Sequence, residues 1–404
     1  MTRATWLTAL LLGAAGAHAA QRVETIDATV LSGQVISIDD KALILRGGGK
    51  DQSVPRGRLV SVSLDKTQQI DHKVAQGLVV THRGDALGLK GLQLDNGRLV
   101  FSNALLGRTQ IALSDAKALF LPGKAETARD IRRRCETMKI AAVSHDILVV
   151  AKDNKLLPVQ GVLKRIAAPR GSSQAKVFFR WQETDRTISL SNVRAIVLAK
   201  AAPAETPIAG TLIGRDGTRV AFSALTLTDR ACKVQTVTAG ARTISRNAIA
   251  GIRFVTVGAD DLSSMRPTVV KEYGFFDRTF PHRLNLSAGG GPLRLNGREY
   301  ATGLGLHSFC ELTYALDGKY ARLVTVAGID DAVRPAGNAE LSFLGDGRPL
   351  GKATALTGKD RPAVLRVDVT GVKTLTIRVG FGSDGLDVAD HVDLAAARLI
   401  KAGT

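Results

Sequence analysis

The side chains best suited to holding a polar ligand lie in the last third of this 404-residue chain. A histidine follows two alternate glycines at 303–307, two aspartates precede an arginine at 330–334, and an aspartate and a histidine are adjacent at 390–391. Carboxylate, guanidinium and imidazole groups can form paired hydrogen bonds with the polar groups of a ligand. The structural alternative is that Asp330 and Asp390 cap turns and that His307 is a buried imidazole.

No catalytic motif accompanies these residues. The chain contains no G-x-S-x-G, H-E-x-x-H or G-x-x-x-x-G-K-[ST] sequence. Cys135, Cys232 and Cys310 lie far apart and form no C-x-x-C pair, so neither a zinc site nor a redox site is indicated, and at most one disulfide can form. A glycoside hydrolase would need two carboxylates flanking a cleft, and no domain of sufficient size is recognisable. We therefore expect a protein that is not an enzyme.

Short strands must position the candidate residues. Apolar side chains alternate with polar ones at 312–316, 323–327, 365–369 and 375–379. Gly-Asp turns separate these runs at intervals of roughly 10 to 15 residues, a spacing typical of antiparallel sheets. The pattern predicts an antiparallel β-sandwich.

This region resembles the NPCBM family of carbohydrate-binding modules over about a third of the chain. The Gly-x-Gly-x-His pattern of the family falls on 303–307, Leu-Gly-Gly-Lys-Tyr corresponds to 316–320, and Gly-x-Asp-Asp falls on 328–331. Gly-Asp-Gly falls on 345–347, and Asp-His-x-Asp-Trp falls on 390–394, where Leu394 replaces the tryptophan. The resemblance implies a jelly-roll β-sandwich of the galactose-binding type.

The resemblance also implies a carbohydrate ligand. The residues that we expect to bind it are His307, Asp330, Asp331, Arg334, Asp390 and His391. If the family tryptophan contributes to a sugar platform, Leu394 weakens or alters binding. An aromatic cluster nearby, Tyr273, Phe275 and Phe276, is expected to pack in the core.

An acidic stretch at 384–393 suggests a structural calcium ion as a cofactor. Calcium takes six to eight oxygen ligands, and Asp384, Asp387 and Asp393 are the candidates. Their spacing is not that of an EF-hand loop, so the calcium expectation rests on the family resemblance.

A motif recurs four times in the first two thirds of the chain. An aliphatic residue is followed by apolar residues at offsets of five, eight and ten in the segments 54–64, 111–121, 188–198 and 244–254. This pattern predicts a strand end, a tight turn and a short alternating strand. With the hairpin sequences upstream, each copy has about five strands, which suits a small barrel of the Sm-like or Src-homology-3-like kind. A continuous arrangement of several sheets is the alternative.

The expected fold is therefore all-β, with repeated small barrel-like modules before a C-terminal sandwich. A basic helix is expected at 125–139 and a linker at 199–206. The expected domains are a signal peptide at 1–19, modules at 20–70, 71–124, 125–200 (with the helix) and 201–262, and the sandwich at 266–404.

The first nineteen residues have the pattern of a secretory signal peptide. Arg3 precedes an apolar run from Ala4 to Gly16, and Ala17-His18-Ala19 offers a cleavage site. The alternative is a buried N-terminal helix. No later stretch reaches 18 uninterrupted apolar residues, so we expect a secreted, periplasmic or cell-surface protein without a transmembrane segment.

The formal charge of +18 is concentrated in the repeats, since the sandwich region at 266–404 accounts for only +3 of it. Export makes nucleic acid an unfavoured partner. It favours an anionic envelope polymer bound by the basic N-terminal modules, with phospholipid head groups as the alternative. Arg132-Arg133-Arg134 is either such a contact or a solvated helix face. We expect an exported, non-catalytic carbohydrate-binding protein. The alternative is an envelope scaffold or protein-interaction protein whose sandwich has lost sugar binding.

Overall fold

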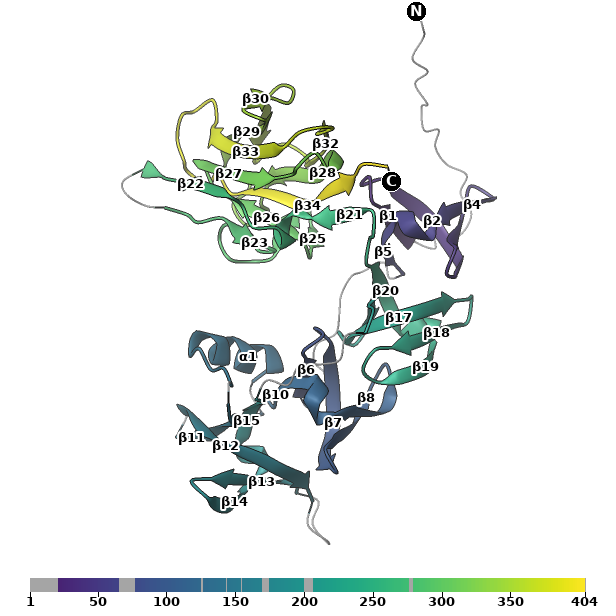
Figure 1. Ribbon diagram of the computed structural model, residues 1–404, viewed down its shortest axis with the longest axis vertical. Coiled ribbons are helices and arrows are strands. Elements are labelled where there is room, and N and C mark those ends of the chain that lie inside the picture. Colours follow the sequence, from purple (N-terminus) through teal and green to yellow (C-terminus); the bar gives the residue numbers. More distant parts are fainter. Residues whose placement is uncertain are drawn as a thin grey trace, which may run out of the picture.

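The computed structural model describes residues 21–64, 77–124, 126–142, 144–153, 155–168, 174–199, 206–275 and 279–403 (Figure 1). The expected signal peptide at 1–19 lies outside these residues. The all-β fold class is confirmed, with repeated small barrels followed by a sandwich. Among the described residues, no helix is long and apolar enough to cross a membrane. Cys135, Cys232 and Cys310 are buried free thiols.

Twenty strands before residue 255 form four barrels of five strands each. The first barrel contains β1 (Gln21–Thr25), β2 (Val30–Ile38), β3 (Ala42–Gly47), β4 (Lys50–Pro55) and β5 (Leu59–Ser63). The second contains β6 (Gly77–Thr81), β7 (Ala86–Asp95), β8 (Arg98–Asn103), β9 (Gly107–Ala112) and β10 (Ala116–Phe120). The third contains β11 (Asp146–Lys152), β12 (Lys155–Ala167), β13 (Lys176–Trp181), β14 (Thr184–Ser189) and β15 (Val193–Val197). The fourth contains β16 (Gly210–Gly214), β17 (Arg219–Leu227), β18 (Ala231–Thr236), β19 (Gly240–Ser245) and β20 (Ile249–Phe254).

All four barrels share one topology. The first strand pairs with the second and the fifth, while the second, third and fourth form a meander. A single 3-10 turn leads from the fourth strand into the fifth, at η1 (Arg56–Arg58), η2 (Leu113–Asp115), η3 (Leu190–Asn192) and η4 (Arg246–Ala248). The recurrent motif has this structure in every copy. Its apolar positions face the core, as Leu59, Val62 and Leu64 do in the first barrel.

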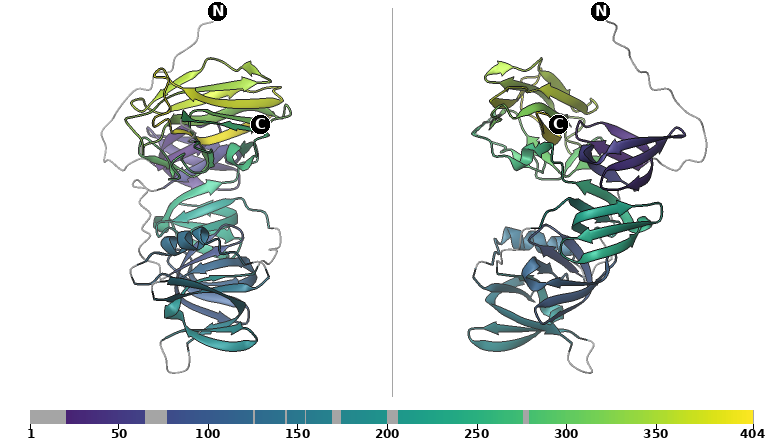
Figure 2. Two further views of the ribbon diagram at one scale, coloured as in Figure 1. Left: turned by 90° about the vertical axis from the view of Figure 1, so that its left-hand side faces the viewer. Right: turned by 45° about the vertical axis from the view of Figure 1, so that its right-hand side comes forward.

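The barrels are joined out of chain order through their fifth strands. β5 pairs antiparallel with β20, with Val62 opposite Ile252, and β10 pairs with β15, with Leu119 opposite Ile196. A backbone pairing between β7 and β17 connects the second barrel to the fourth. The barrels therefore stack in the order first, fourth, second, third (Figures 1 and 2). The two alternatives from the sequence are both present, since separate barrels share one continuous sheet.

One helix, α1 (Ala128–Thr137), lies in the expected basic segment. Thr127 and Asp130 form a capping box at its N-terminus, and Ile131 and Cys135 are buried against the second and third barrels. Two of the three consecutive arginines are used in ion pairs, Arg132 with Glu136 and Arg134 with Glu126.

The C-terminal region is a sandwich of two six-stranded antiparallel sheets. One sheet has the order β23-β26-β34-β28-β32, with β21 pairing with β34. Its strands are β21 (Ala259–Asp261), β23 (Arg283–Leu284), β26 (Gly303–Leu306), β28 (Tyr320–Ile329), β32 (Ala363–Asp368) and β34 (Val392–Lys401). The short turn η5 (Leu262–Ser264) follows β21, and its buried leucine joins the core.

The second sheet of the sandwich has the order β22-β27-β33-β29-β30, and β31 pairs with β29. Its strands are β22 (Val269–Glu272), β27 (Cys310–Ala315), β29 (Asn338–Gly345), β30 (Arg348–Pro349), β31 (Thr354–Thr357) and β33 (Thr374–Phe381). A separate hairpin comprises β24 (Leu293–Leu295) and β25 (Arg298–Tyr300). The alternating residues Leu312, Tyr314, Ile377 and Val379 fill the core between the sheets, as their pattern predicts.

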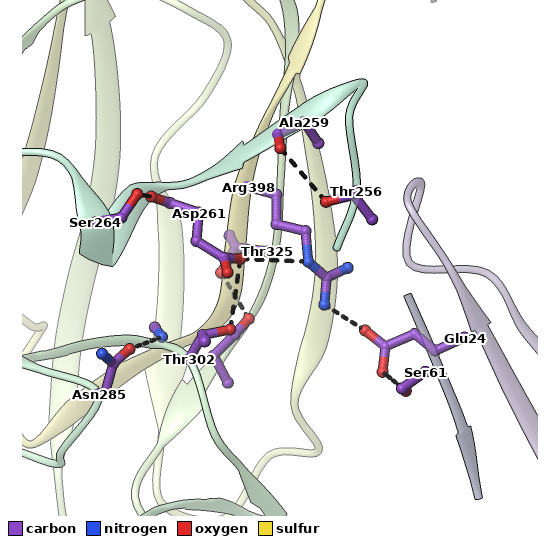
Figure 3. Close-up of polar contacts among 12 residues, drawn as sticks. Glu24, Ser61, Thr256, Ala259, Asp261, Ser264, Asn285, Thr302, Thr325 and Arg398 are labelled. Carbon is purple, nitrogen blue, oxygen red and sulfur yellow. Dashed lines mark hydrogen bonds and ion pairs between the residues drawn. The ribbon is translucent and has the colours of Figure 1, made fainter. Parts of the chain in front are cut away.

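The sandwich is docked on the first barrel by a buried ion-pair network (Figure 3). The Glu24 carboxylate of β1 accepts hydrogen bonds from Arg398 of β34 at 2.7 Å and from Arg298 of β25 at 2.6 Å. Burial alone would raise the pKa of Glu24, but the two arginines hold it below its ordinary value. Beside this network, Ala28 of the first barrel packs with Ile400 of the sandwich in a small apolar cluster.

We expect Glu24→Gln to destabilise this junction by roughly 3 kcal/mol, because it leaves two partly or fully buried arginines without their counter-ion. The lowered pKa of Glu24 means that its stabilisation is present above pH 4.5 and is lost as the pH falls through the folded-state pKa. Denaturant unfolding of both forms at pH 7 and at decreasing pH measures the difference.

Asp51→Asn is the matched control, because the pair of Asp51 with Arg46 is exposed and such pairs contribute little to stability. An equal loss in both variants would show that the Glu24 network does not hold the junction.

Candidate functional site

Three strand ends bring the predicted binding residues to one end of the sandwich. Leu306, the last residue of β26, and Ile329, the last residue of β28, both pair with Val392, the first residue of β34. The residues that follow β26 and β28 and the residue that precedes β34 therefore meet. These are His307, Asp330 and His391.

Two glycines of the sequence motif allow this convergence. Gly303 has φ of +143°, and a Cβ there would lie 2.4 Å from the carbonyl oxygen of Leu394. A Cβ on Gly305 would lie 2.3 Å from the carbonyl oxygen of Leu286. Only glycine permits such close backbone approach, so the motif shapes the strand that leads to His307.

Three rings form a cluster at this end. The Phe280 ring stacks on His307 with centroids 4.2 Å apart, and His307 meets His391 edge to face at 5.3 Å. His307 is only 3% exposed, and its Nδ1 hydrogen-bonds the carbonyl oxygen of Ser308. His391 and Phe280 are half-buried. Burial and the neighbouring His307 lower the pKa of His391, so its imidazole is neutral at pH 7 and can both donate and accept.

Asp390 joins two loops beneath the rings. Its Oδ2 accepts from the Ser308 hydroxyl at 2.6 Å, and its Oδ1 accepts from the backbone N–H of Asn338 at 2.9 Å. Burial raises the pKa of Asp390, although both hydrogen bonds act in the opposite direction. Its carboxyl group is fully buried and engaged within the protein.

Asp330 and Asp393 form a second buried pair of carboxyl groups. The backbone N–H of Arg294 donates to both, at 3.2 Å to Asp330 and 3.0 Å to Asp393. Burial, and then the hydrogen bond and charge of Asp330, raise the pKa of Asp393 to about 9. A protonated Asp393 lets the two groups lie together without charge repulsion. The pair holds the β24–β25 hairpin against β28 and β34.

Asp331 and Arg334 lie at the rim. The Asp331 carboxylate accepts from the backbone N–H groups of Asn296 at 2.8 Å and Gly297 at 2.6 Å. Asn296 and Gly297 both have positive φ, as the tight turn of a β-hairpin requires. The Arg334 guanidinium is 3.9 Å from Asp331 and partly exposed.

The structure thus gathers the predicted residues but buries half of them. His307, Asp330 and Asp390 have 3%, 1% and 0% of their surface exposed, which favours the structural alternative for these three. Asp331, Arg334 and His391 retain accessible surface.

The calcium candidates are not brought together. Asp393 is buried in β34 and bonded to the backbone, whereas Asp384 is exposed and Asp387 accepts from the N–H of Phe275. No group of three or more histidine, cysteine, aspartate or glutamate side chains that could hold a metal occurs in the described part of the chain. These three aspartates therefore do not fit a calcium site.

Aromatic residues near His307 have roles that their sequence pattern does not predict. Phe280 is part of the ring cluster, and its only sequence signal is its place beside Pro281 and His282. The expectation that Tyr273 and Phe275 pack in the core is wrong. Tyr273 is 54% exposed and stacks on Phe309 with centroids 4.4 Å apart, while Phe275 contacts Phe381. Phe276, the third member of the expected cluster, lies outside the described residues.

Leu394, which replaces the family tryptophan, is 0% exposed in the core of the sandwich. A core position cannot present a ring to a sugar. The replacement is therefore no evidence that sugar binding has been weakened.

Comparison with known proteins agrees with this architecture. The family model of the NPCBM/NEW2 domain matches residues 258–400, the segment from β21 to β34. Residues 258–400 form an NPCBM/NEW2 domain. The match begins before residue 266 because β21 pairs with β34 and belongs to the sandwich.

One curated relative of this chain is a Renibacterium salmoninarum protein named as an endo-alpha-N-acetylgalactosaminidase. It is 32% identical over 90 residues, which are 22% of this chain and 6% of that protein, so this chain spans a small fraction of its relative.

Solved structures include CBM51 of a Clostridium perfringens GH95 protein in complex with methyl-galactose, at 23% identity, covering 35% of this chain and 99% of that chain, with a TM-score of 0.31. The tandem CBM51 modules of a Streptococcus pneumoniae family 98 glycoside hydrolase show 12% identity, covering 95% of this chain and 89% of that chain, with a TM-score of 0.30. These TM-scores are too low for either likeness to carry an argument.

The NPCBM domain should lose stability as the pH rises, because the folded-state pKa of Asp393 lies above its ordinary value. The stabilisation linked to its proton is fully present below about pH 4 and is lost as the pH rises through about 9. Asp393→Asn imitates the protonated group, so we expect it to remove a slope of up to about 1.4 kcal/mol per pH unit between pH 5 and 8.

Denaturant unfolding across that pH range, with the exposed Asp384→Asn as control, measures the slope. Parallel curves for the native protein and Asp393→Asn would contradict the proposed protonation.

Proposed function

We propose that this chain is a non-catalytic glycan-binding protein whose NPCBM domain holds a carbohydrate at the end formed by β26, β28 and β34. The observation that carries the proposal is the convergence of an aromatic and histidine cluster with a rigid carboxylate network at one end of a domain of this family. Binding sites are commonly built from a few polar groups fixed beside an apolar surface.

The groups available to the glycan are those at the rim. The neutral His391 imidazole offers one donor and one acceptor, the half-buried Phe280 ring offers an apolar face, and Arg334 offers donors. Asp330, Asp390 and Asp393 support these groups from below, because their oxygens accept from backbone N–H groups of the surrounding loops. This division gives a preorganised site, in which little freedom is lost when the ligand binds.

We further propose export, as the N-terminal sequence predicts, and retention near an anionic envelope polymer through the basic barrels. Attraction between exposed charges weakens as salt shortens the Debye length from about 10 Å at 0.1 M to about 3 Å at 1 M. Sedimentation of the full chain with isolated cell-wall material should therefore decrease as salt is raised. Salt-independent sedimentation would contradict attachment by charge.

The test of glycan binding is an array screen of the full chain, followed by titration of the best glycan with His391→Ala. Removing the imidazole deletes polar contacts to the sugar, so we expect at least a tenfold loss of affinity, about 1.4 kcal/mol or more. His145→Ala is the matched control, because His145 is an exposed histidine in the third-barrel segment.

Because Asp384, Asp387 and Asp393 lie apart and the described residues form no metal-binding group, we expect a chelator to leave binding unchanged. Absence of saturable binding to any glycan would overturn the proposal and favour the alternative of an envelope scaffold or protein-interaction protein.

A further inference from the structure

A cavity of about 710 Å³ lies between the NPCBM domain, the first and fourth barrels and helix α1. Its volume is within the range of about 300–1,000 Å³ found for small-molecule sites. It is separate from the site at the sandwich end, since Thr302 before β26 lines the cavity whereas His307 follows β26. The loop at 285–292 separates the two, with Gly289 beside His391 and Gly291 on the cavity wall.

The cavity is strongly basic. Seven arginines line it against three acidic residues. The acids are already engaged, because Glu24 pairs with Arg298 and Arg398, Glu299 pairs with Arg294, and Asp261 lies 3.6 Å from Arg398. The cavity therefore carries a positive charge that its own acids do not balance.

Arg253 is a cation of the cavity wall whose charge is only weakly balanced. It lies on β20 between Thr211 of β16 and Ser61 of β5, at the seam of the two barrels. Burial lowers the pKa of Arg253, and the attraction of Glu24 and Asp261 is opposed by the repulsion of Arg398 and Arg219. An arginine stays charged in proteins, and the two carboxylates that attract it already pair with other arginines. A largely desolvated charge with so little compensation is costly, and an anion in the cavity would lower that cost.

Arg398 gives a second, independent indication that the cavity binds a ligand. Its side chain is 5% exposed, and its Nη2 is held by Glu24 at 2.7 Å. Its Nη1 is buried without an acceptor among the described residues. A buried donor is rarely left unpaired in a native protein, so an acceptor supplied by a ligand is the expected partner.

The remaining wall suits a sugar. Asn285 uses its Oδ1 to accept from the N–H of Gly303 at 3.1 Å, which leaves its amide NH₂ group for a ligand hydroxyl. Tyr300 is half-buried, and its ring lies 4.6 Å from the Arg298 guanidinium carbon. Arginines beside an amide and a partly open ring can pair with a carboxylate or sulfate while also contacting a sugar ring and its hydroxyls.

We propose that this cavity binds an acidic saccharide, whose carboxylate or sulfate groups pair with Arg253 and Arg398 and whose hydroxyl groups meet Asn285. This is a second site, formed jointly by the barrels and the NPCBM domain, and it does not depend on glycan binding at the sandwich end.

Calorimetric titration of the full chain tests the proposal with four probes: trigalacturonate, a sulfated heparin disaccharide, neutral maltotriose and inorganic sulfate. We expect at least one acidic saccharide to bind tenfold or more tightly than maltotriose and sulfate. Equal affinity for the neutral sugar, or sulfate alone binding as tightly as the acidic saccharides, would overturn the proposal.

Arg253→Gln should weaken the acidic saccharide at least tenfold, whereas Arg230→Gln removes a highly exposed arginine and should leave affinity unchanged. Because the attraction of Arg253 to Glu24 and Asp261 is opposed by Arg398, Arg219 and burial, Arg253→Gln should melt no lower than the native protein, which shows that it folds. Should it fail to fold, Arg219→Gln, which also lines the cavity, replaces it.

Affinity in the folded arginine variant equal to that of the native protein would refute the assignment. His391→Ala should retain the acidic saccharide, so failure of the sandwich-end site and failure of the cavity are distinguishable.

Discussion

The buried Glu24 carboxylate is the constraint on which the arrangement of the domains depends. A single carboxylate pairs with Arg298 and with the Nη2 of Arg398, which belong to two strands of the NPCBM domain, and the described cysteines form no disulfide between the parts. Burying Glu24 and Arg398 is tolerable only while their charges stay together. The ion pairs therefore fix one relative position of barrel and sandwich, and the cavity between them exists only in that position.

At the other end of β26, near His307, buried carboxyl groups hold the loops of the NPCBM domain together. Asp330, Asp390 and Asp393 lie in motifs whose residue types suggest ligand binding. Their oxygens instead accept hydrogen bonds from backbone N–H groups of neighbouring segments. Acidic residues in such motifs can act by fixing the shape of a site. Ligand contact is left to the groups that surround them, whose identity the motif does not specify.

The repeated barrels were predictable because the apolar spacing of their motif follows from local geometry. A strand, one 3-10 turn and a second strand place the four positions in the core or, for Ile188, packed against it. The convergence of the loops at His307, Asp330 and His391 was predictable from family motifs. Burial of the acids was not, because their donors, such as Asn338 for Asp390 and Arg294 for Asp393, are 52 and 99 residues away in sequence. The pairing of β5 with β20 has no local signal either, since any exposed strand edge can accept it.

The pairing of β5 with β20 affects how the chain folds during its synthesis. The outer edge of β5 has no partner until β20 has been synthesised, after the second and third barrels. Contacts of such large sequence separation form slowly, and an open strand edge invites pairing with other chains in the meantime. The edge strand of the first barrel therefore stays unpaired for longer than those of the other barrels. The risk of aggregation through this edge ends when β20 of the fourth barrel pairs with β5.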